Sequence, residues 1–413
     1  MKNINITKLP SGITIVSEYL PYVKSFSLGF WFNVGSVDEN KKNNGISHFL
    51  EHMFFKGTKK RSAKRIADDI ESLGGYLNAF TSKEHTCFYG RGLTKNLPKT
   101  FDVLADMIQN PLFRQKDIDK EANVVIDELY DIEDTPEELI FDKFETVIYD
   151  KSSLALPIIG TENNLKNFKP GDLFGYIEKK YANNKLYIVA SGDVNHDLLL
   201  ELTSKYVTKD FGKSPKRKNY KLYGSVKDSF VSKNIQQVHT IIGTRTVGFN
   251  NKQRNAVNIL SHILGEGSSA RLFQSLRERN GIAYQVNTFL NSFYDVSTFG
   301  VYLSTNEKMI KKSYGIIEKE FERIKTKKVP LKELNRAKEY LKGSILMGLE
   351  STTNRMTRMG QSMLYFNKVK SVEESINEIN LVDQNVVLEL ANRILQQDNF
   401  TRVVIGSGDK NIN

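Results

Sequence analysis

Cysteine is almost absent from this 413-residue chain, which contains only Cys87. A single cysteine excludes an internal disulfide framework and any metal cluster built from several thiolates. The chain also lacks a run approaching the roughly 18 consecutive apolar residues of a membrane-spanning helix, so no membrane association is expected. At the amino terminus, apolar residues alternate with polar ones and do not form the apolar core of a signal peptide. We therefore expect a cytoplasmic protein.

The charge balance is positive, whereas the rest of the composition is that of a folded globular protein. Lysine and arginine outnumber aspartate and glutamate by 59 to 48, which gives a formal net charge of +11. Such an excess can indicate a nucleic-acid-binding protein, because basic side chains neutralise phosphates. The densest cluster, between Lys213 and Lys221, instead has the polar composition of a linker and lacks an ordered aromatic series. We interpret it as a solvated basic linker and expect no nucleic acid partner.

A weak internal repeat organises the chain. Residues 50–57 align with 260–267, residues 187–193 with 402–409, and the charged amphipathic stretch 116–136 with 332–352. The three matches occur in the same order and at similar separations, which a duplication explains more simply than coincidence does. We therefore predict one domain at residues 1–215 and a homologous one at residues 235–413, separated by a basic linker at residues 216–234.

Each half contains segments with strand periodicity and segments with helix periodicity. Strands are expected at residues 25–34, 86–93, 238–244 and 296–304, and helices at residues 63–73, 98–109, 117–130, 256–264, 310–324 and 331–347. Strands and helices arrive in runs without strict alternation, which favours two α+β domains over one parallel sheet. The predicted fold is therefore two homologous domains, each a mostly antiparallel sheet packed with helices.

The sequence His48-Phe-Leu-Glu51-His52 places two histidines and a glutamate at helical spacing. Positions three and four apart lie on one face of a helix, so the three side chains share that face. Two imidazoles one turn apart can bind the same zinc ion, and the carboxylate between them can reach a water molecule there. The order H-x-x-E-H is the inverted form of the commoner zinc-peptidase motif.

A motif of five residues can also arise by chance, so its surroundings decide its meaning. Phe49, Leu50 and residues 53–55 would bury most of this helix, and buried histidines and glutamate are costly unless they are paired or bind metal. A second predicted helix carries Glu121 and Glu128 about two turns apart on its buried side. Either carboxylate could approach the histidines, so the sequence favours a metal site.

The second copy keeps the apolar pattern of this region and loses the polar residues. In the repeat alignment, His48, Glu51 and His52 correspond to Asn258, Ser261 and His262, and Glu121 and Glu128 correspond to Ala337 and Ser344. Only the first half is therefore expected to bind metal.

These features together resemble the pitrilysin and insulin-degrading-enzyme superfamily of zinc peptidases. Within it, the chain is most similar to the short members related to the catalytic subunit of the mitochondrial processing peptidase. The resemblance extends over essentially the whole chain. It implies one Zn²⁺ per chain, bound by His48, His52 and Glu128, with Glu51 as the catalytic base. Glu121 matches an additional glutamate that supports the zinc ligands in the family.

The resemblance also implies where substrate binds. Residues 73–81 are similar to an edge strand that pairs with extended peptide, a mode in which the main chain gives affinity. The expected substrate-binding residues in that strand are Asn78, Ala79 and Phe80. Glu138 and Asp142 match acidic positions that recognise an arginine ahead of the cleavage site, although acidic residues also favour the start of any helix. A preference for a basic residue upstream of the cut is therefore a further hypothesis.

A segment of the second half resembles the part of the family that completes the active site. Residues 271–284 contain Arg277 and Tyr284 at the matching positions. A guanidinium group and a phenol hydroxyl are suitable donors to the oxyanion of a tetrahedral intermediate. Both residues are therefore expected to be catalytic.

The sequence as a whole predicts a zinc-dependent endopeptidase that hydrolyses extended or unfolded peptides. A homodimer is expected, because residues 265–269 are not the long glycine-rich stretch of the non-catalytic processing-peptidase subunit. Three alternatives stay open: a non-catalytic assembly subunit of the same family, a nucleic-acid-binding protein, and a different hydrolase with the same metal ligands. The intact set of motif residues argues against the first, because a non-catalytic subunit has little reason to keep it.

Overall fold

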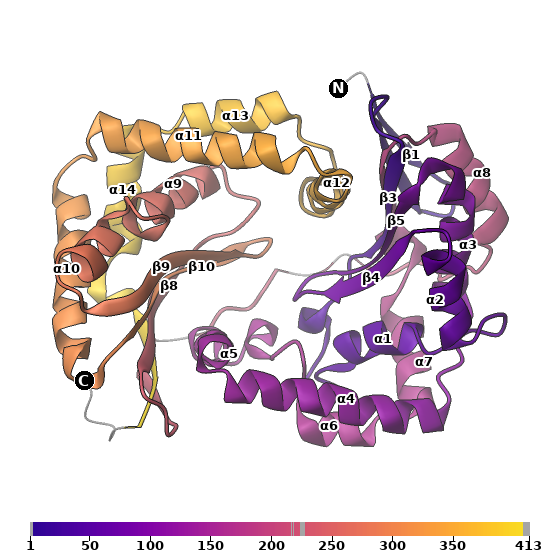
Figure 1. The fold of residues 1–413 in the computed structure, drawn as a ribbon, viewed down its shortest axis with the longest axis horizontal. Coiled ribbons are helices and arrows are strands. Elements are labelled where there is room, and N and C mark those ends of the chain that lie inside the picture. The colour runs from indigo at the N-terminus through magenta and orange to yellow at the C-terminus, as the bar shows by residue number, and fades with distance from the viewer. Residues whose placement is uncertain (1–2, 216, 218, 224–227, 408–413) are drawn as a thin grey trace. The chain divides into compact units, whose positions relative to one another are not determined.

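The computed structural model describes residues 3–215, 217, 219–223 and 228–407. The chain folds into two compact units, each with its own sheet and its own helices (Figure 1). The described residues of Met1–Tyr130, Leu156–Lys218 and Met347–Lys370 form the first unit, and those of Asp131–Ala155, Asn219–Leu346 and Ser371–Asn413 form the second. Two units that each combine one sheet with helices confirm the predicted α+β fold class.

The first unit is built on a six-stranded sheet with the order β1-β2-β6-β3-β5-β4. Its strands are β1 (Ile4–Lys8), β2 (Thr14–Tyr19), β3 (Ser25–Phe32), β4 (Tyr76–Thr81), β5 (Thr86–Leu93) and β6 (Leu186–Gly192). Neighbouring strands are antiparallel except for β2 and β6, which are parallel. β4 lies at one edge of this sheet.

The second unit is built on a five-stranded sheet with the order β7-β11-β8-β10-β9. Its strands are β7 (Asp228–Ser232), β8 (Val238–Val247), β9 (Ala283–Ser292), β10 (Val296–Thr305) and β11 (Thr401–Gly406). β7 and β11 are parallel and the other pairs are antiparallel. In chain order, β7 to β11 therefore repeat the connectivity of β2 to β6. This shared topology is what the internal duplication predicts.

Helices pack against both sheets. Those of the first unit are α1 (Ile46–Phe54), α2 (Ala63–Glu71), α3 (Leu97–Gln109), most of α4 (Gln115–Asp134), α6 (Glu162–Asn167), α7 (Pro170–Lys180), α8 (His196–Tyr206) and α12 (Thr352–Phe366). Those of the second unit are α5 (Pro136–Tyr149), α9 (Arg254–Gly265), α10 (Ile310–Thr326), most of α11 (Leu331–Gly348), α13 (Val372–Asn380) and α14 (Gln384–Ile394). All strands and helices expected from periodicity are present with closely similar bounds. Within the described part of the chain, none of the helices is long and apolar enough to cross a membrane.

Different helices cover the two faces of the first sheet. Phe30 and Trp31 are consecutive residues of β3, so their side chains point to opposite faces. The ring of Phe30 packs against Phe101 of α3, with 5.1 Å between the ring centroids. The indole Nε1 of Trp31 lies 3.2 Å from the sulfur of Met356 in α12. The side chains of Phe30 and Trp31 are both fully buried. α3 therefore covers one face of the sheet at β3, and α12 covers the other.

The helices α5 and α12 are exchanged between the two halves of the sequence. α12 belongs to the second half but packs on β3 and β6 of the first unit. α5 belongs to the first half but packs on β8 and β11, the second-unit equivalents of β3 and β6. The compact units therefore differ from a division into residues 1–215 and 235–413. Periodicity shows that one face of a helix is buried, but it does not show which sheet buries it.

The predicted solvated linker at residues 216–234 is partly ordered structure. Residues 228–232 form β7, which pairs in parallel with β11. Arg217 is only 17% exposed, and its guanidinium group lies 2.6 Å from Asp38 and 2.8 Å from Asn33 within the first unit. Residues 216, 218 and 224–227 of that prediction lie outside the described residues. The sequence did not predict these two features, because a short strand and one half-buried ion pair leave little periodic signal.

Candidate metal centre

The start of α1, the helix that carries the motif, is capped by the side chain of Glu39, which precedes the helix in the sequence. Its N-cap residue is Gly45, which has a φ of 98° and no side chain that could accept a hydrogen bond. Glu39 supplies the missing acceptor: its carboxylate accepts hydrogen bonds from the backbone N–H groups of Gly45 and Ser47, each at 2.8 Å. The sequence had given no reason to single out Glu39.

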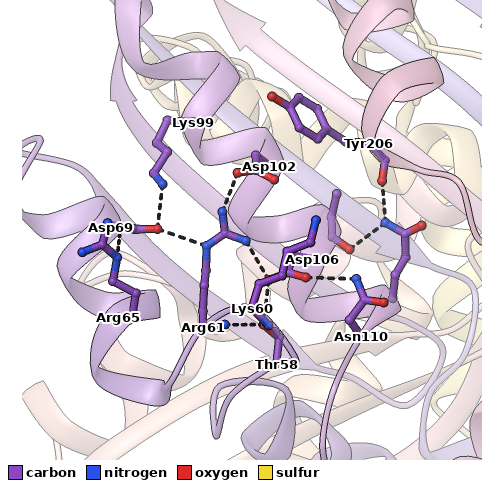
Figure 2. Close-up of polar contacts among 12 residues, drawn as sticks. Thr58, Lys60, Arg61, Arg65, Asp69, Lys99, Asp102, Asp106, Asn110 and Tyr206 are labelled. Atoms are coloured by element: carbon purple, nitrogen blue, oxygen red, sulfur yellow. Dashed lines mark hydrogen bonds and ion pairs between the residues drawn. The ribbon is translucent and has the colours of Figure 1, made fainter.

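The connection that follows α1 is held by a buried arginine (Figure 2). Arg61 Nε lies 3.0 Å from Asp69 of α2, and its Nη1 atom lies 2.6 Å from Asp106 of α3. Its Nη2 atom also contacts Asp102 of α3. The hydroxyl of Thr58 donates to Asp106 at 2.7 Å. The guanidinium group of Arg61 therefore connects the segment that follows the motif helix to both α2 and α3.

One side of α1 is buried in the first unit and the other side carries the motif. Phe49 and Leu50 are fully buried, and the ring of Phe54 packs edge-on against Phe88 of β5 at 5.0 Å. On the other side, the motif side chains His48, Glu51 and His52 are half-buried. The apolar residues thus fix the rotation of the helix and direct the motif away from the core.

The side chains of His48, His52 and Glu128 gather at one point. The Nε2 atoms of His48 and His52 lie 4.0 Å and 3.6 Å from the Oε2 atom of Glu128, which is on α4. One ligand atom from each residue lies within 4.8 Å of the other two. Two imidazole nitrogens and one carboxylate oxygen are a donor set of catalytic zinc sites, in which a fourth position stays open. The three side chains therefore supply the donor set for one zinc ion.

Glu121 lies behind His52 and orients it. The Nδ1 atom of His52 is 2.9 Å from Oε1 of Glu121, and the other carboxylate oxygen is 2.5 Å from Nζ of Lys56. When Nδ1 donates to this carboxylate, the lone pair of His52 is on Nε2 and faces Glu128. Of the two glutamates that the sequence offered as a third ligand, the geometry therefore favours Glu128. Lys56 was missed because it lies beyond Phe54, the last residue of α1, where the helical spacing no longer applies.

Burial and neighbouring charges shift the pKa values of the motif residues. Burial, assisted by repulsion from His52, lowers the pKa of His48 to about 4, so its imidazole is neutral and able to bind metal. Burial also lowers the pKa of His52, but the hydrogen bond with Glu121 and the nearby carboxylates raise it overall. Burial raises the pKa of Glu51 against an opposing hydrogen bond. A raised pKa suits a carboxylate that must take up and return a proton near neutral pH.

The expected substrate-binding segment is the edge strand β4. In the described sheet its neighbour is β5, and the backbone edge on the other side of β4 has no strand beside it. Along the strand, Asn78 is exposed, Ala79 is buried, and the ring of Phe80 packs against Trp31 with 5.4 Å between centroids. An unpaired strand edge is the geometry that strand addition by a peptide requires.

Four residues expected at the site belong to the second unit. Arg277 lies in a π-helical segment, and its guanidinium carbon is 5.9 Å from the ring centroid of Tyr284, whose side chain is 71% exposed. Glu138 and Asp142 lie one turn apart on α5. The structure thus brings Arg277 and Tyr284 together. Whether any of the four acts with the histidine pair of the first unit stays a prediction.

The second unit holds aromatic and hydroxyl groups at the position equivalent to the histidine cluster. The imidazole of His262 on α9 stacks on Tyr340 of α11, with 4.2 Å between ring centroids. The hydroxyl of Ser261 lies 3.0 Å from that of Thr288. In the described part of the chain, three potential ligands of histidine, cysteine or acidic type gather only at His48, His52 and Glu128.

Two α+β units with the same strand connectivity, of which only the first carries an H-x-x-E-H helix, define a class of two-domain chains with a candidate metal centre in the first copy. The chain belongs to the insulinase family, peptidase family M16. The model of that family matches residues 14–162, and the model of the peptidase M16 inactive domain matches residues 167–341. This assignment confirms the resemblance to the pitrilysin and insulin-degrading-enzyme superfamily.

The chain aligns with relatives over nearly the whole length of both partners. The chain is 34% identical to an uncharacterized zinc protease of Rickettsia felis, over 99% of this chain and 98% of the relative. It is 35% identical to an uncharacterized zinc protease of Bacillus subtilis, over 97% of each chain. Among solved structures, a protease from Helicobacter pylori superposes with a TM-score of 0.90 at 22% identity, covering 98% of this chain and 99% of the other. At that identity the structural match supports the fold alone.

Proposed function

We propose that this protein is a zinc-dependent endopeptidase that hydrolyses extended or unfolded peptides. The observation that carries the proposal is the gathering of His48, His52 and Glu128, with Glu51 on the same helix face. Relatives that align over nearly their whole length are named zinc proteases, which supports the same reaction class.

In this proposal, the residues of the first unit have separate roles. His48, His52 and Glu128 would hold one zinc ion per chain, and Glu121 would keep His52 in the correct tautomer. When bound, zinc polarises a carbonyl group and lowers the pKa of a water molecule. Glu51 takes the proton of the attacking water and delivers it to the leaving amine, so the carboxylate ends the cycle as it began.

The proposed substrate is a peptide that adds to β4 as an extended strand. Main-chain pairing along the free edge gives affinity for any sequence, with Asn78, Ala79 and Phe80 beside the peptide. A folded protein would have to expose a strand for this pairing, so unfolded or extended chains are the preferred class. From the family resemblance we further propose that Arg277 and Tyr284 donate hydrogen bonds to the oxyanion.

Metal content and peptide cleavage of three variants test the proposal. Glu51→Gln should bind zinc like the parent but cleave a fluorogenic peptide at least about 100-fold more slowly, because its amide cannot accept the proton. His52→Ala should lose both zinc and cleavage. Glu201→Gln, a glutamate exposed on α8, is the matched control and should behave like the parent. A parent that takes up no stoichiometric zinc, or Glu51→Gln with the parent's rate, would contradict the proposal.

The finer features need separate measurements. Cleavage of a mixed peptide library tests the basic preference: Glu138 and Asp142 have that role only if arginine or lysine is enriched upstream of the cut. Light scattering tests the proposed homodimer. Zinc binding without cleavage of any peptide would favour the alternative, a non-catalytic assembly subunit of the same family.

A further inference from the structure

We propose that Thr81 is a positioning residue that holds the Glu51 carboxylate in the orientation needed for proton transfer. The inference rests on the proposed function, in which Glu51 is the base. Thr81 is the last residue of the segment that resembles a peptide-binding edge strand, and the inference gives its side chain a role of its own: it links the base directly to the strand proposed to bind peptide.

The contact itself is short and specific. The Oγ1 hydroxyl of Thr81 donates a hydrogen bond to Oε2 of Glu51 at 2.5 Å. This distance is typical of a hydroxyl that donates to an ionised carboxylate, which is a stronger contact than one between neutral groups. The two residues are 30 positions apart in the chain, so the bond joins the motif helix α1 to the end of β4.

The architecture of the sheet directs Thr81 toward α1. Thr81 is paired with Thr86 of β5, and Thr86 with Phe32 of β3. Residues directly opposite one another in a sheet point to the same face. The ring of Phe32 packs against Phe88, and Phe88 packs against Phe54 of α1. Thr81 therefore points to the α1 side of the sheet because of its register.

The hydrogen bond restricts the base in a useful way. A glutamate side chain has three rotatable bonds, and ordering it costs conformational entropy. Thr81 engages Oε2 and leaves Oε1 of Glu51 for proton transfer. A base that is misplaced by about an ångström can lower a rate by about 100-fold, so a fixed carboxylate is worth a large factor.

The same bond couples the base to the peptide. Thr81 is the last residue of β4, and a peptide paired along the free edge of β4 takes its register from that strand. One hydroxyl would thus hold Glu51 at a set distance from the paired peptide backbone. Register and base position would then be fixed by the same strand.

Variants of Thr81 separate positioning from structural support. Thr81→Val removes the donor at nearly constant shape, and Thr81→Ser keeps it. The matched control is Thr203→Val on α8, where the lost hydroxyl donates to the carbonyl of Leu199 at 2.7 Å. For each protein we would determine a metal-free crystal structure, the zinc content, and kcat and KM for a fluorogenic peptide. Thr81→Val would also be combined with Glu51→Gln.

We expect the Glu51 carboxylate to be ordered against residue 81 in the parent and in Thr81→Ser, and to be displaced or in several conformers in Thr81→Val. We expect Thr81→Val to lower kcat about tenfold or more, with KM within about twofold of the parent. Thr81→Ser and Thr203→Val should retain at least about half of the parent's kcat. In the Glu51→Gln background, Thr81→Val should cause no further loss.

An unchanged Glu51 conformation in Thr81→Val would overturn the proposal, as would an effect of equal size in the Glu51→Gln background. A change in KM alone would also overturn it, because it would assign Thr81 to peptide binding. A parent that cleaves no peptide would defeat the proposed function, and the metal-free crystal structures would still decide whether Thr81 positions Glu51.

Discussion

Glu121 on α4 accepts a hydrogen bond from Nδ1 of His52, a residue 69 positions earlier in the chain, at 2.9 Å. The other oxygen of the same carboxylate is paired with Lys56. Burial alone would raise the pKa of Glu121, but the hydrogen bonds from His52 and Lys56 lower it overall. The carboxylate is therefore ionised at neutral pH, and it both fixes the tautomer of His52 and raises the basicity of its Nε2 atom.

Removing this support should weaken metal binding without removing a ligand. Glu121→Gln should lower zinc affinity about 10- to 100-fold, because a neutral amide polarises the imidazole less. Competition with a chelating dye at fixed pH measures the affinity directly. Lys64→Met, on the exposed side of α2, is the control and should leave the affinity unchanged. An unaltered zinc affinity in Glu121→Gln would show that the contact with His52 is only structural.

Zinc should stabilise the fold, since a ligand that binds only the native state shifts the unfolding equilibrium. At a free zinc concentration 100 times the dissociation constant, the gain is about 2.7 kcal/mol. Thermal unfolding with zinc and with excess chelator should therefore differ by several degrees in the parent. The difference should vanish in His48→Ala. Equal shifts in both proteins would point to zinc bound elsewhere.

The sequence was informative wherever structure follows a local period. The strands, the helices and the facing of His48, Glu51 and His52 all follow from spacings of two, three or four residues. The duplication was also detectable, because both halves keep their apolar pattern. The choice between Glu121 and Glu128 did not follow from spacing, because both lie on the same helix face and only the family resemblance separated them.

Contacts between residues far apart in the sequence could not be predicted from these local spacings. Glu39, Lys56 and Thr81 support the motif through hydrogen bonds and ion pairs made largely outside their own elements, and no spacing in the sequence indicates those contacts. The exchange of α5 and α12 was missed for a related reason: an amphipathic helix specifies that it needs a partner, and not which one.

Glu39 should make stability depend on pH. Burial raises the pKa of its carboxyl to about 7 from 4.5, although the hydrogen bonds from Asn44, Ser47 and Gly45 lower it. A carboxyl that binds its proton more tightly in the folded state stabilises the fold below about pH 4.5. That contribution is lost as pH rises through about 7, and its full size is about 3 kcal/mol.

Urea unfolding of the parent and of Glu39→Gln between pH 4.5 and 8 checks this dependence. The free energy of unfolding of the parent should fall relative to the variant as the pH rises through about 7. The glutamine does not titrate, so subtracting its profile removes the contributions of other groups. A difference that is constant, or that grows with pH, would contradict a raised pKa for Glu39.

Arg61 should be among the most sensitive charged residues of the first unit. Its side chain is 9% exposed and contacts three carboxylates, so Arg61→Met would leave buried negative charges without their shared cation. Loss of one partner from such a buried group typically costs about 3–5 kcal/mol. Arg65 pairs with Asp69 from a side chain that is 64% exposed, and Arg65→Met should cost less than about 1 kcal/mol. Urea unfolding should resolve the two, and equal losses would refute the distinction.

A substitution at Gly360 tests whether α12 packs on the first sheet. A Cβ atom built on Gly360 would lie 2.6 Å from Cε2 of Trp31, so an alanine there forces the helix or the indole to move. We expect Gly360→Ala to destabilise the protein by about 1–3 kcal/mol, as overpacking does. Trp31 is the only tryptophan, so its fluorescence reports this contact and should shift to the red. Gly175→Ala on α7, whose added Cβ meets nothing within 4 Å, should instead leave the spectrum unchanged and stabilise the helix by up to about 1 kcal/mol. A Gly360→Ala protein with the parent's spectrum and stability would show that α12 does not pack on Trp31 in solution.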